Sequence, residues 1–150
     1  EILQALEKAR EIDPRILIEE GLEVREIECG IIGNSTLLTS EIGEVQYESD
    51  WYDYDSKYYS NNKITIPAEI DSKISKEIKE IAIKSCRALN IFGFARVDFF
   101  LEKSSNKILL NEINTIPGFT KNSMFPMLWK ASGLNIEQLV AKLVDISLDL

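Results

Sequence analysis

The stretch FARVDFFLEKSSNKILLNEINTIPGFT, residues 94–120, decides the fold of this chain. Two apolar segments flank the polar sequence EKSSN, a pattern that predicts a β-hairpin. If the turn is centred on the second serine of EKSSN, Asp98 lies opposite Glu112 and Arg96 lies opposite Asn114. Residues two apart in a strand share a face, so these four polar side chains converge on one side of the hairpin.

The other face of the hairpin is apolar and is predicted to be a core face. Its members would be Val97, Phe99, Leu101, Leu109 and Ile113. A register slip of one residue would scatter the polar set over both faces, whereas a slip of two would keep it together. The pattern therefore predicts a sheet with one apolar face and one polar face.

The polar set has the chemistry of a metal site. Asp98, Glu112 and Asn114 supply only oxygen ligands, which suit a hard cation such as Mg²⁺. Arg96 cannot be a ligand, but it would be a fixed positive charge beside the site for an anion or a charged transition state. A solvated hairpin face with one cross-strand ion pair would give the same pattern. The spacing alone leaves both interpretations open.

Composition excludes several classes of protein. The 150 residues are 45% apolar and 28% charged, which suits one globular domain or a large part of one. The net charge of −8 without a basic cluster argues against a nucleic-acid partner. No apolar run or signal pattern argues for a membrane or for secretion, so we expect a cytoplasmic location. The chain opens in what reads as mid-helix at Glu1, and we expect a fragment of a longer protein.

The residue types that are missing narrow the chemistry. The sequence has no histidine, which removes Ser-His-Asp and Cys-His nucleophiles and His-ligated zinc. Cys29 and Cys86 lie far apart without a CxxC spacing and are expected to be buried, reduced thiols. The sequence contains neither a Walker A motif nor GxGxxG, so P-loop and Rossmann nucleotide binding are excluded.

The remaining pattern predicts an α+β fold. An antiparallel sheet with helices packed on one face is expected, because amphipathic helices alternate with strands of period two. The long stretch 49–62 has no period and reads as a loop, and such loops are often functional. The other predicted elements are a helix end at 1–11, strands at 15–20, 24–33 and 36–48, and helices at 71–89, 122–131 and from about 135.

Three groups of motifs carry a family resemblance. The sequences IEEGLEVREIECGIIGN, YDYDSKY and ARVDFFL…LLNEINTIPGFTKNSMFP occur in this order and at consistent spacing. Together they resemble the C-terminal part of the D-alanine–D-alanine ligases, members of the ATP-grasp superfamily. The resemblance covers the chain from about Ile16 to its end. It implies that residues 1–22 end the central ATP-grasp subdomain and that 23–150 form the C-terminal catalytic subdomain.

The resemblance implies an activity and its cofactors. Such enzymes phosphorylate the carboxylate of one D-alanine with ATP, and the amine of a second D-alanine displaces the phosphate. The dipeptide enters peptidoglycan precursors in the bacterial cytoplasm. The implied cofactors are ATP and two Mg²⁺ ions, with Mn²⁺ as a substitute, and the implied full-length assembly is a homodimer.

The resemblance also implies roles for single residues. Asp98, Glu112 and Asn114 would bind the metal ions, with Glu112 bridging them, and Arg96 and the backbone N–H of Gly118 would stabilise the tetrahedral adduct. The other implied contacts are with substrates. Ser123, Met124 and Lys57 would hold the second amino acid, Tyr58 would help close the loop, and Glu19, Glu20, Leu22 and Glu26 would bind the adenine and ribose of ATP.

Each assignment has a simpler alternative. Glu19 and Glu26 could be ordinary charges at a strand edge, and Lys57 and Tyr58 could merely keep a loop soluble. Ser123 could cap the short helix that begins nearby. The joint match at many positions is what favours the functional roles.

Three interpretations of the whole chain compete. The first is a D-alanine–D-alanine ligase fragment, the second another ATP-grasp carboxylate–amine ligase, and the third a non-catalytic nucleotide-binding or scaffold module. The substrate motifs favour the first over the second, and the intact set Asp98, Glu112, Asn114 and Arg96 argues against the third. The family's N-terminal substrate domain and phosphate lid do not occur in these residues, so we expect the chain alone to be inactive.

Overall fold

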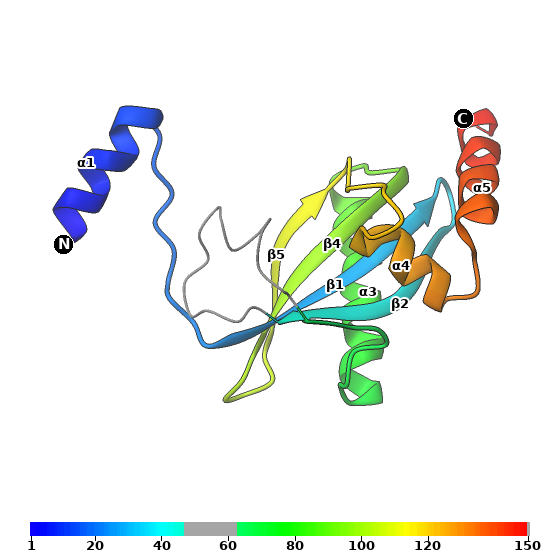
Figure 1. Cartoon of the computed structure of the whole chain (residues 1–150), viewed down its shortest axis with the longest axis horizontal. Helices are drawn as coiled ribbons and strands as arrows, with labels where there is room; N and C mark the ends of the chain where they lie inside the picture. The colour runs from blue at the N-terminus through cyan, green and yellow to red at the C-terminus, as the bar shows by residue number, and fades with distance from the viewer. Residues whose placement is uncertain (47–62, 150) are drawn as a thin grey trace.

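The computed structural model describes residues 1–46 and 63–149 of the chain. All its strands belong to one antiparallel sheet with the order β3-β2-β1-β4-β5 (Figure 1). The elements are α1 (Ile2–Ile12), β1 (Val24–Gly33), β2 (Leu37–Gln46), β3 (Lys63–Thr65), α3 (Ser72–Ala88), β4 (Gly93–Glu102), β5 (Ile108–Asn114), α4 (Met124–Ala131) and α5 (Ile136–Leu148). The predicted α+β class and antiparallel sheet are confirmed.

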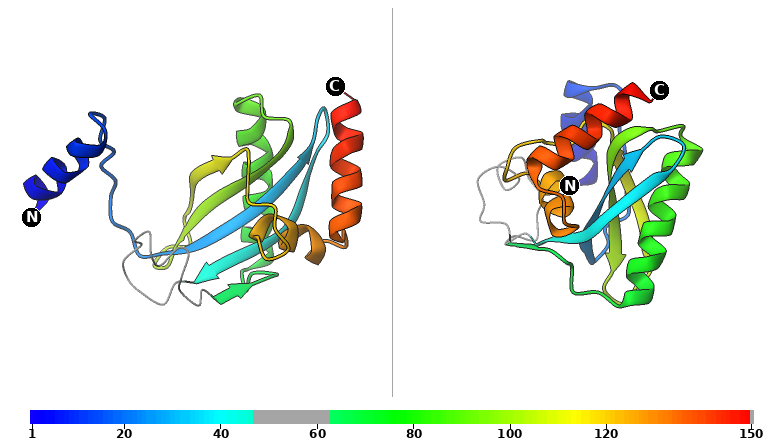
Figure 2. Two further views of the ribbon diagram at one scale, coloured as in Figure 1. Left: turned by 45° about the horizontal axis from the view of Figure 1, so that its top comes forward. Right: turned by 90° about the vertical axis from the view of Figure 1, so that its right-hand side faces the viewer.

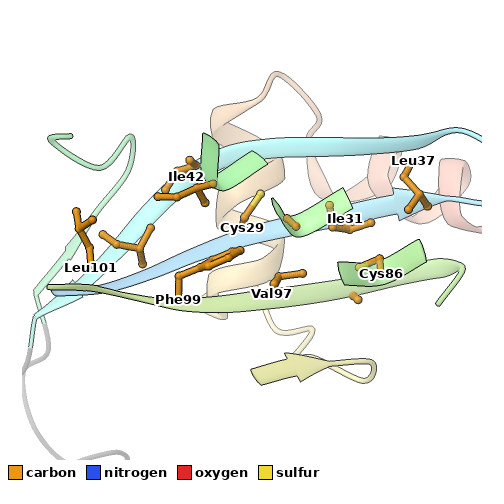
Figure 3. Packing of buried hydrophobic residues seen from close by; sticks show 12 residues of the cluster. Cys29, Ile31, Leu37, Ile42, Cys86, Val97, Phe99 and Leu101 are labelled. Carbon is orange, nitrogen blue, oxygen red and sulfur yellow. The ribbon is translucent and has the colours of Figure 1, made fainter. Parts of the chain in front are cut away.

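One face of the sheet packs against α3 and forms the main core. Odd-numbered residues of β1 and β4, such as Cys29 and Val97, meet Ile78, Ala82 and Cys86 of the helix, and all five are fully buried (Figure 3). Asp71 caps the start of α3, since its carboxylate accepts a 2.7 Å hydrogen bond from the backbone N–H of Lys73. This is the helix-covered face that the sequence predicts, and both thiols are buried in it as expected.

The helices α4 and α5 pack against one end of the opposite face (Figure 2). Phe125 and Trp129 of α4 and Leu139 of α5 bury Ile32 of β1 there. The expectation of helices on one face therefore describes α3 alone. Among residues 1–46 and 63–149, no helix covers the rest of the opposite face, and we call this opposite face the site face.

The hairpin between β4 and β5 has the predicted register over its polar part. Asp98 pairs with Glu112 and Arg96 pairs with Asn114. The register shifts by one residue after Asp98, and from there Phe100 pairs with Leu109. A one-residue bulge exchanges the faces of the residues beyond it. The core assignment of Leu109 is therefore wrong, and Ile108 packs against the main core in its place.

The N-terminal segment does not pack on the sheet. No residue of α1 is buried, and this helix lies away from the sheet (Figure 1). The strand predicted at 15–20 is absent, and Leu17 and Ile18 there are 79% and 76% exposed. A strand needs a neighbour for its backbone hydrogen bonds, and no described strand pairs with this segment. Over 1–46 and 63–149, no helix is long and apolar enough to cross a membrane.

Candidate functional site

The predicted site residues follow one another along the site face of β4. Phe100 lies at one end, Asp98 and Arg96 follow, and Phe94 lies at the other end under the C-terminal helices. Same-face neighbours in a strand are about 6.6 Å apart, so this row spans about 20 Å. Three regions meet along it, namely a hollow, a charged cluster and a loop.

The charged cluster is a partly buried arginine held between two carboxylates. Nε and Nη2 of Arg96 each donate a 2.7 Å hydrogen bond to Asp98, and Nε also lies 3.0 Å from Oε2 of Glu28. Glu28 and Asp98 are direct partners across β1 and β4, and they are 8% and 9% exposed. Glu28 was not among the predicted site residues. The only signal for it was its place two residues after Glu26, on the same face of its strand.

The electrostatics of the cluster favour a fixed positive charge at Arg96. Burial acts to lower the pKa of this guanidinium, but the hydrogen bonds with Asp98 and the charges of Glu28, Asp98 and Glu112 outweigh it. The pKa of Arg96 is therefore raised above its ordinary value, and the group remains charged at any physiological pH.

The predicted metal ligands lie side by side on the site face. Glu112 is exposed beside Asp98, and Asn114 is half-buried, with its Oδ1 accepting a 3.0 Å hydrogen bond from the N–H of Ile116. Within the described ranges, no three acidic or sulfur side chains are arranged around one point as a ready cation site. Asp98 instead faces Arg96.

The donor set nevertheless fits a hard cation. Three carboxylates, from Glu28, Asp98 and Glu112, act on the single guanidinium of Arg96, so negative charge is in excess. Carboxylate and amide oxygens are the ligands that Mg²⁺ prefers, and a divalent cation would balance the excess charge. Asp98, Glu112 and Asn114 are the residues that could hold it.

A loop after β5 carries the predicted residues Gly118 and Ser123. The Ser123 hydroxyl accepts a 3.0 Å hydrogen bond from the N–H of Thr120 and lies 2.8 Å from the Thr120 hydroxyl. A Cβ at position 118 would come within 3.0 Å of the Ser123 hydroxyl oxygen, so a glycine leaves that hydroxyl its space. Phe119 anchors the loop, since its ring is 6.4 Å from that of Phe94 and 5.9 Å from that of Phe125.

The start of α4 follows directly on this loop. Ser123 is in the N-cap position but makes no side-chain capping hydrogen bond, so its hydroxyl serves the loop and not the helix. Met124 is the first helical residue, where a backbone N–H has no partner within the helix. Its side chain is buried beside Val45 and Leu128. The backbone N–H of Met124 and the Ser123 hydroxyl are therefore adjacent polar groups.

The four residues predicted to contact ATP line one hollow. Its volume is about 1200 Å³, and it is open to solvent at the end of the sheet opposite α4 and α5. Phe100 and Leu109 add apolar surface to it, the latter because of the bulge in β5. The predicted contacts that line it are Glu19, Glu20, Leu22 and Glu26. Lys57 and Tyr58, predicted in the loop 49–62, lie outside the described residues.

This arrangement defines a class of protein. An antiparallel sheet that presents acidic oxygen donors between a hollow and a polar loop is what the ATP-grasp resemblance implies for a C-terminal subdomain. The family model described as the D-ala D-ala ligase C-terminus matches residues 1–145. The chain belongs to this family.

Similar proteins agree with the family. A D-alanine–D-alanine ligase of Prochlorococcus marinus strain MIT 9215 is 91% identical over 150 residues, all of this chain and 42% of the relative. The ligase of another strain of Prochlorococcus marinus is 51% identical over 146 residues, 97% of this chain and again 42% of the relative. This chain therefore spans well under half the length of the curated relatives it matches.

Two solved structures have the same fold. The D-alanine–D-alanine ligase from Coxiella burnetii is 34% identical with a TM-score of 0.84, over 99% of this chain and 38% of that one. The VanG D-Ala:D-Ser ligase from Enterococcus faecalis is 38% identical with a TM-score of 0.75, over 85% of this chain and 37% of that one. The names of these two enzymes differ in the second amino acid, D-alanine in one and D-serine in the other.

Proposed function

We propose that this chain is the C-terminal catalytic part of a D-alanine–D-alanine ligase. ATP would phosphorylate the carboxylate of one D-alanine, and the amine of a second would attack that acyl phosphate and release phosphate. The single observation that supports this function best is the order of groups along the site face. The hollow, the acidic cluster, Arg96 and the Ser123 loop follow one another, as nucleotide, metal, reacting carboxyl and second substrate would.

The nucleotide would bind at the hollow. Glu26 would accept hydrogen bonds from the ribose hydroxyls, and Glu19 would accept one from the adenine amino group. The backbone of Glu20 and Leu22 would line the base, with Phe100 and Leu109 as apolar contacts. These assignments rest on the shared hollow and on the family.

The phosphates would lie over Asp98, Glu112 and Asn114. Mg²⁺ or Mn²⁺ bound there would neutralise charge on the transferring phosphoryl group. Arg96 would stabilise the negative charge that develops on the substrate oxygen, because its own charge is fixed and partly buried. The N–H of Gly118 would donate to the same oxygen.

The second D-alanine would bind at the loop after β5. The Ser123 hydroxyl, the N–H of Met124 and Lys57 would receive its carboxylate, and Tyr58 would help close the loop over the site. We further propose that residues 1–22 belong to the central subdomain and 23–150 to the C-terminal one, and that the full-length protein is a cytoplasmic homodimer.

The test is product formation by the full-length protein. With ATP, Mg²⁺ and D-alanine, mass spectrometry is expected to find D-alanyl-D-alanine with one ADP and one phosphate released for each dipeptide. Glu112→Gln is expected to abolish it, whereas Glu77→Gln, an exposed acid on α3, is expected to leave the rate unchanged. Preferred formation of D-alanyl-D-serine from an equimolar mixture would replace the proposed second substrate. Absence of ATP-dependent dipeptide from any D-amino acid would refute the function.

A further inference from the structure

Glu28 belongs to the charged cluster, but the proposed reaction assigns no role to it. It comes from β1, whereas Arg96 and Asp98 come from β4, and it lies diagonally across the strand pair from Arg96. Its side chain is at least as buried as that of Asp98. A buried carboxylate is costly unless it is paired with a positive charge. The cation that the structure places at ion-pair distance from it is Arg96.

Asp98 would have two roles that conflict, namely pairing with Arg96 and binding a metal ion. In the structure it holds the Arg96 guanidinium through two hydrogen bonds of 2.7 Å. In the proposed function it is also a metal ligand. A carboxylate that turns towards a metal ion cannot keep both hydrogen bonds of a bidentate arginine pair, so Arg96 needs another acceptor at that moment.

Glu28 is placed to be that acceptor. Its Oε2 is 3.0 Å from Nε of Arg96, the same nitrogen that donates to Asp98. Once Asp98 turns away, a small rotation of the Glu28 carboxylate could bring one of its oxygens into line with the Nε–H, so the guanidinium would stay in place. We propose that Glu28 is a positioning residue that keeps Arg96 in place when Asp98 gives its carboxylate to a metal ion, an inference that rests on the proposed function.

A positioning role for Glu28 predicts different kinetics from a role in which its charge merely attracts cations. Without Glu28, Asp98 is the remaining close counter-ion of Arg96, so metal and arginine compete for one carboxylate. Glu28→Gln should then lower kcat and raise the free Mg²⁺ concentration for half-maximal rate. Because Glu28 does not line the hollow and has no proposed role in binding substrate, the KM values for ATP and D-alanine should stay within about threefold of wild type.

The kinetic experiment is a double-mutant cycle on the full-length protein with Glu28→Gln and Arg96→Lys. Glu28→Gln is expected to lower kcat about 10- to 100-fold in the wild-type background, the cost of a misplaced catalytic group. In the Arg96→Lys background it should lower kcat less than about twofold, because the residue through which it acts is already impaired. Glu28→Asp should restore part of kcat, and Glu41→Gln, an acid paired with Lys79 at 3.6 Å, should match wild type. Equal fold losses in both backgrounds would overturn the proposal.

A second measurement does not depend on activity. The thermal unfolding midpoints of wild type, Glu28→Gln, Arg96→Met and the double variant are compared with and without Mg²⁺. The effect of Glu28→Gln is expected to be several degrees more favourable in Arg96→Met than in wild type, since Glu28 then lacks the Arg96 guanidinium. This coupling should persist or grow when Mg²⁺ is added. Its loss on adding Mg²⁺ would refute the handover even if the dipeptide is formed.

The kinetic and unfolding measurements test the proposed function and the role of Glu28 separately. If the wild-type protein makes no dipeptide, the proposed function fails, and the coupling in Mg²⁺ still decides whether Glu28 holds Arg96. Should Arg96→Met fail to fold, the Arg96→Lys pair serves for the unfolding cycle. A persistent coupling supports the handover and a vanished one overturns it.

Discussion

Two arginines on opposite faces of the same sheet make similar pairs in different surroundings: Arg25 and Glu44 lie at the rim of the hollow, and Arg96 lies in the charged cluster. On the α3 face, Arg25 makes two 2.7 Å hydrogen bonds with Glu44 and a third of 3.0 Å with the backbone oxygen of Glu69. On the site face, Arg96 makes two 2.7 Å hydrogen bonds with Asp98. The bond lengths do not distinguish the two pairs.

The balance of charge around the two arginines does distinguish these pairs. The hydrogen bonds from Arg25 lower the pKa of Glu44 and raise that of Arg25; Glu69 also acts on Arg25 and Lys63 also acts on Glu44, so two carboxylates meet two cations. Around Arg96, the carboxylates of the described residues outnumber the guanidinium. A balanced pair has what it needs for stability, whereas an excess of negative charge leaves a place for a further cation. This difference, rather than the presence of an ion pair, supports the proposed cation site.

The comparison between the Arg96 and Arg25 pairs is tested most strongly by removing the carboxylate from each pair in turn. Asp98→Asn removes a proposed metal ligand, and kcat of the full-length ligase is expected to fall about 10³-fold, because charge stabilisation at the phosphates is lost. Steady-state release of phosphate in D-alanine and ATP measures it. A fall below about tenfold with folding intact would mean that Asp98 is not a ligand.

Glu44→Gln is the counterpart on the α3 face. It leaves Arg25, whose side chain is 28% exposed, without its carboxylate. The free energy of unfolding is expected to fall by about 2 kcal/mol, between the values for exposed and fully buried pairs. Urea unfolding monitored by circular dichroism measures it, with Glu41→Gln as a control for the lost charge. An unchanged midpoint would show that this pair contributes nothing to stability.

The stability lost in Glu44→Gln should depend on pH in one direction. The pKa of Glu44 is lower in the folded than in the unfolded protein, mainly because of its hydrogen bonds with Arg25. Its contribution to stability is therefore present above the unfolded pKa, about 4.3, and disappears as the pH falls through the folded value. The difference in unfolding free energy between wild type and Glu44→Gln should narrow below about pH 4.

The hairpin shows how far the sequence predicts the site. Alternation of polar and apolar residues sets which face a strand residue takes, so the pairing of Asp98 with Glu112 followed from the pattern. The bulge that turns Leu109 to the hollow did not follow, because an extra residue leaves no mark in an apolar run. The strand predicted at 15–20 failed because pairing depends on residues distant in sequence.

Glu28 illustrates the other limit. A single acid in a half-buried strand is most often a solvent-facing charge, and only the pairing of β1 with β4 brings it to Arg96. The order of the two strands in the sheet is a property of the whole fold. Residues that act through a neighbouring strand are therefore found by structure, while residues within one hairpin are found by sequence.

A smaller effect tests whether the loop and the hollow act separately. Phe119→Ala removes the aromatic contacts with Phe94 and Phe125 that anchor the loop carrying Gly118 and Ser123. The KM for the second D-alanine is expected to rise about tenfold, and that for ATP to change little, because aromatic pairs contribute about 1 kcal/mol. Phe92→Ala, at a ring that is 58% exposed, is the matched control. An equal rise in both KM values would mean that the loop and the hollow are one unit.

The smallest expected effect is in the apolar core between the sheet and α3. Cys29 is fully buried, and burial raises the pKa of its thiol to about 12. Because the unfolded value is about 8.5, the thiol's contribution to stability is complete below that pH and is lost as pH rises towards the folded value. Cys29→Ala is expected to cost about 1 kcal/mol at pH 7 through lost packing. The cost should shrink at pH 10, where wild type also loses stability because its buried thiol resists ionisation. A constant difference between pH 7 and 10 in urea unfolding would show that the thiol ionises as freely in the folded chain as in the unfolded one.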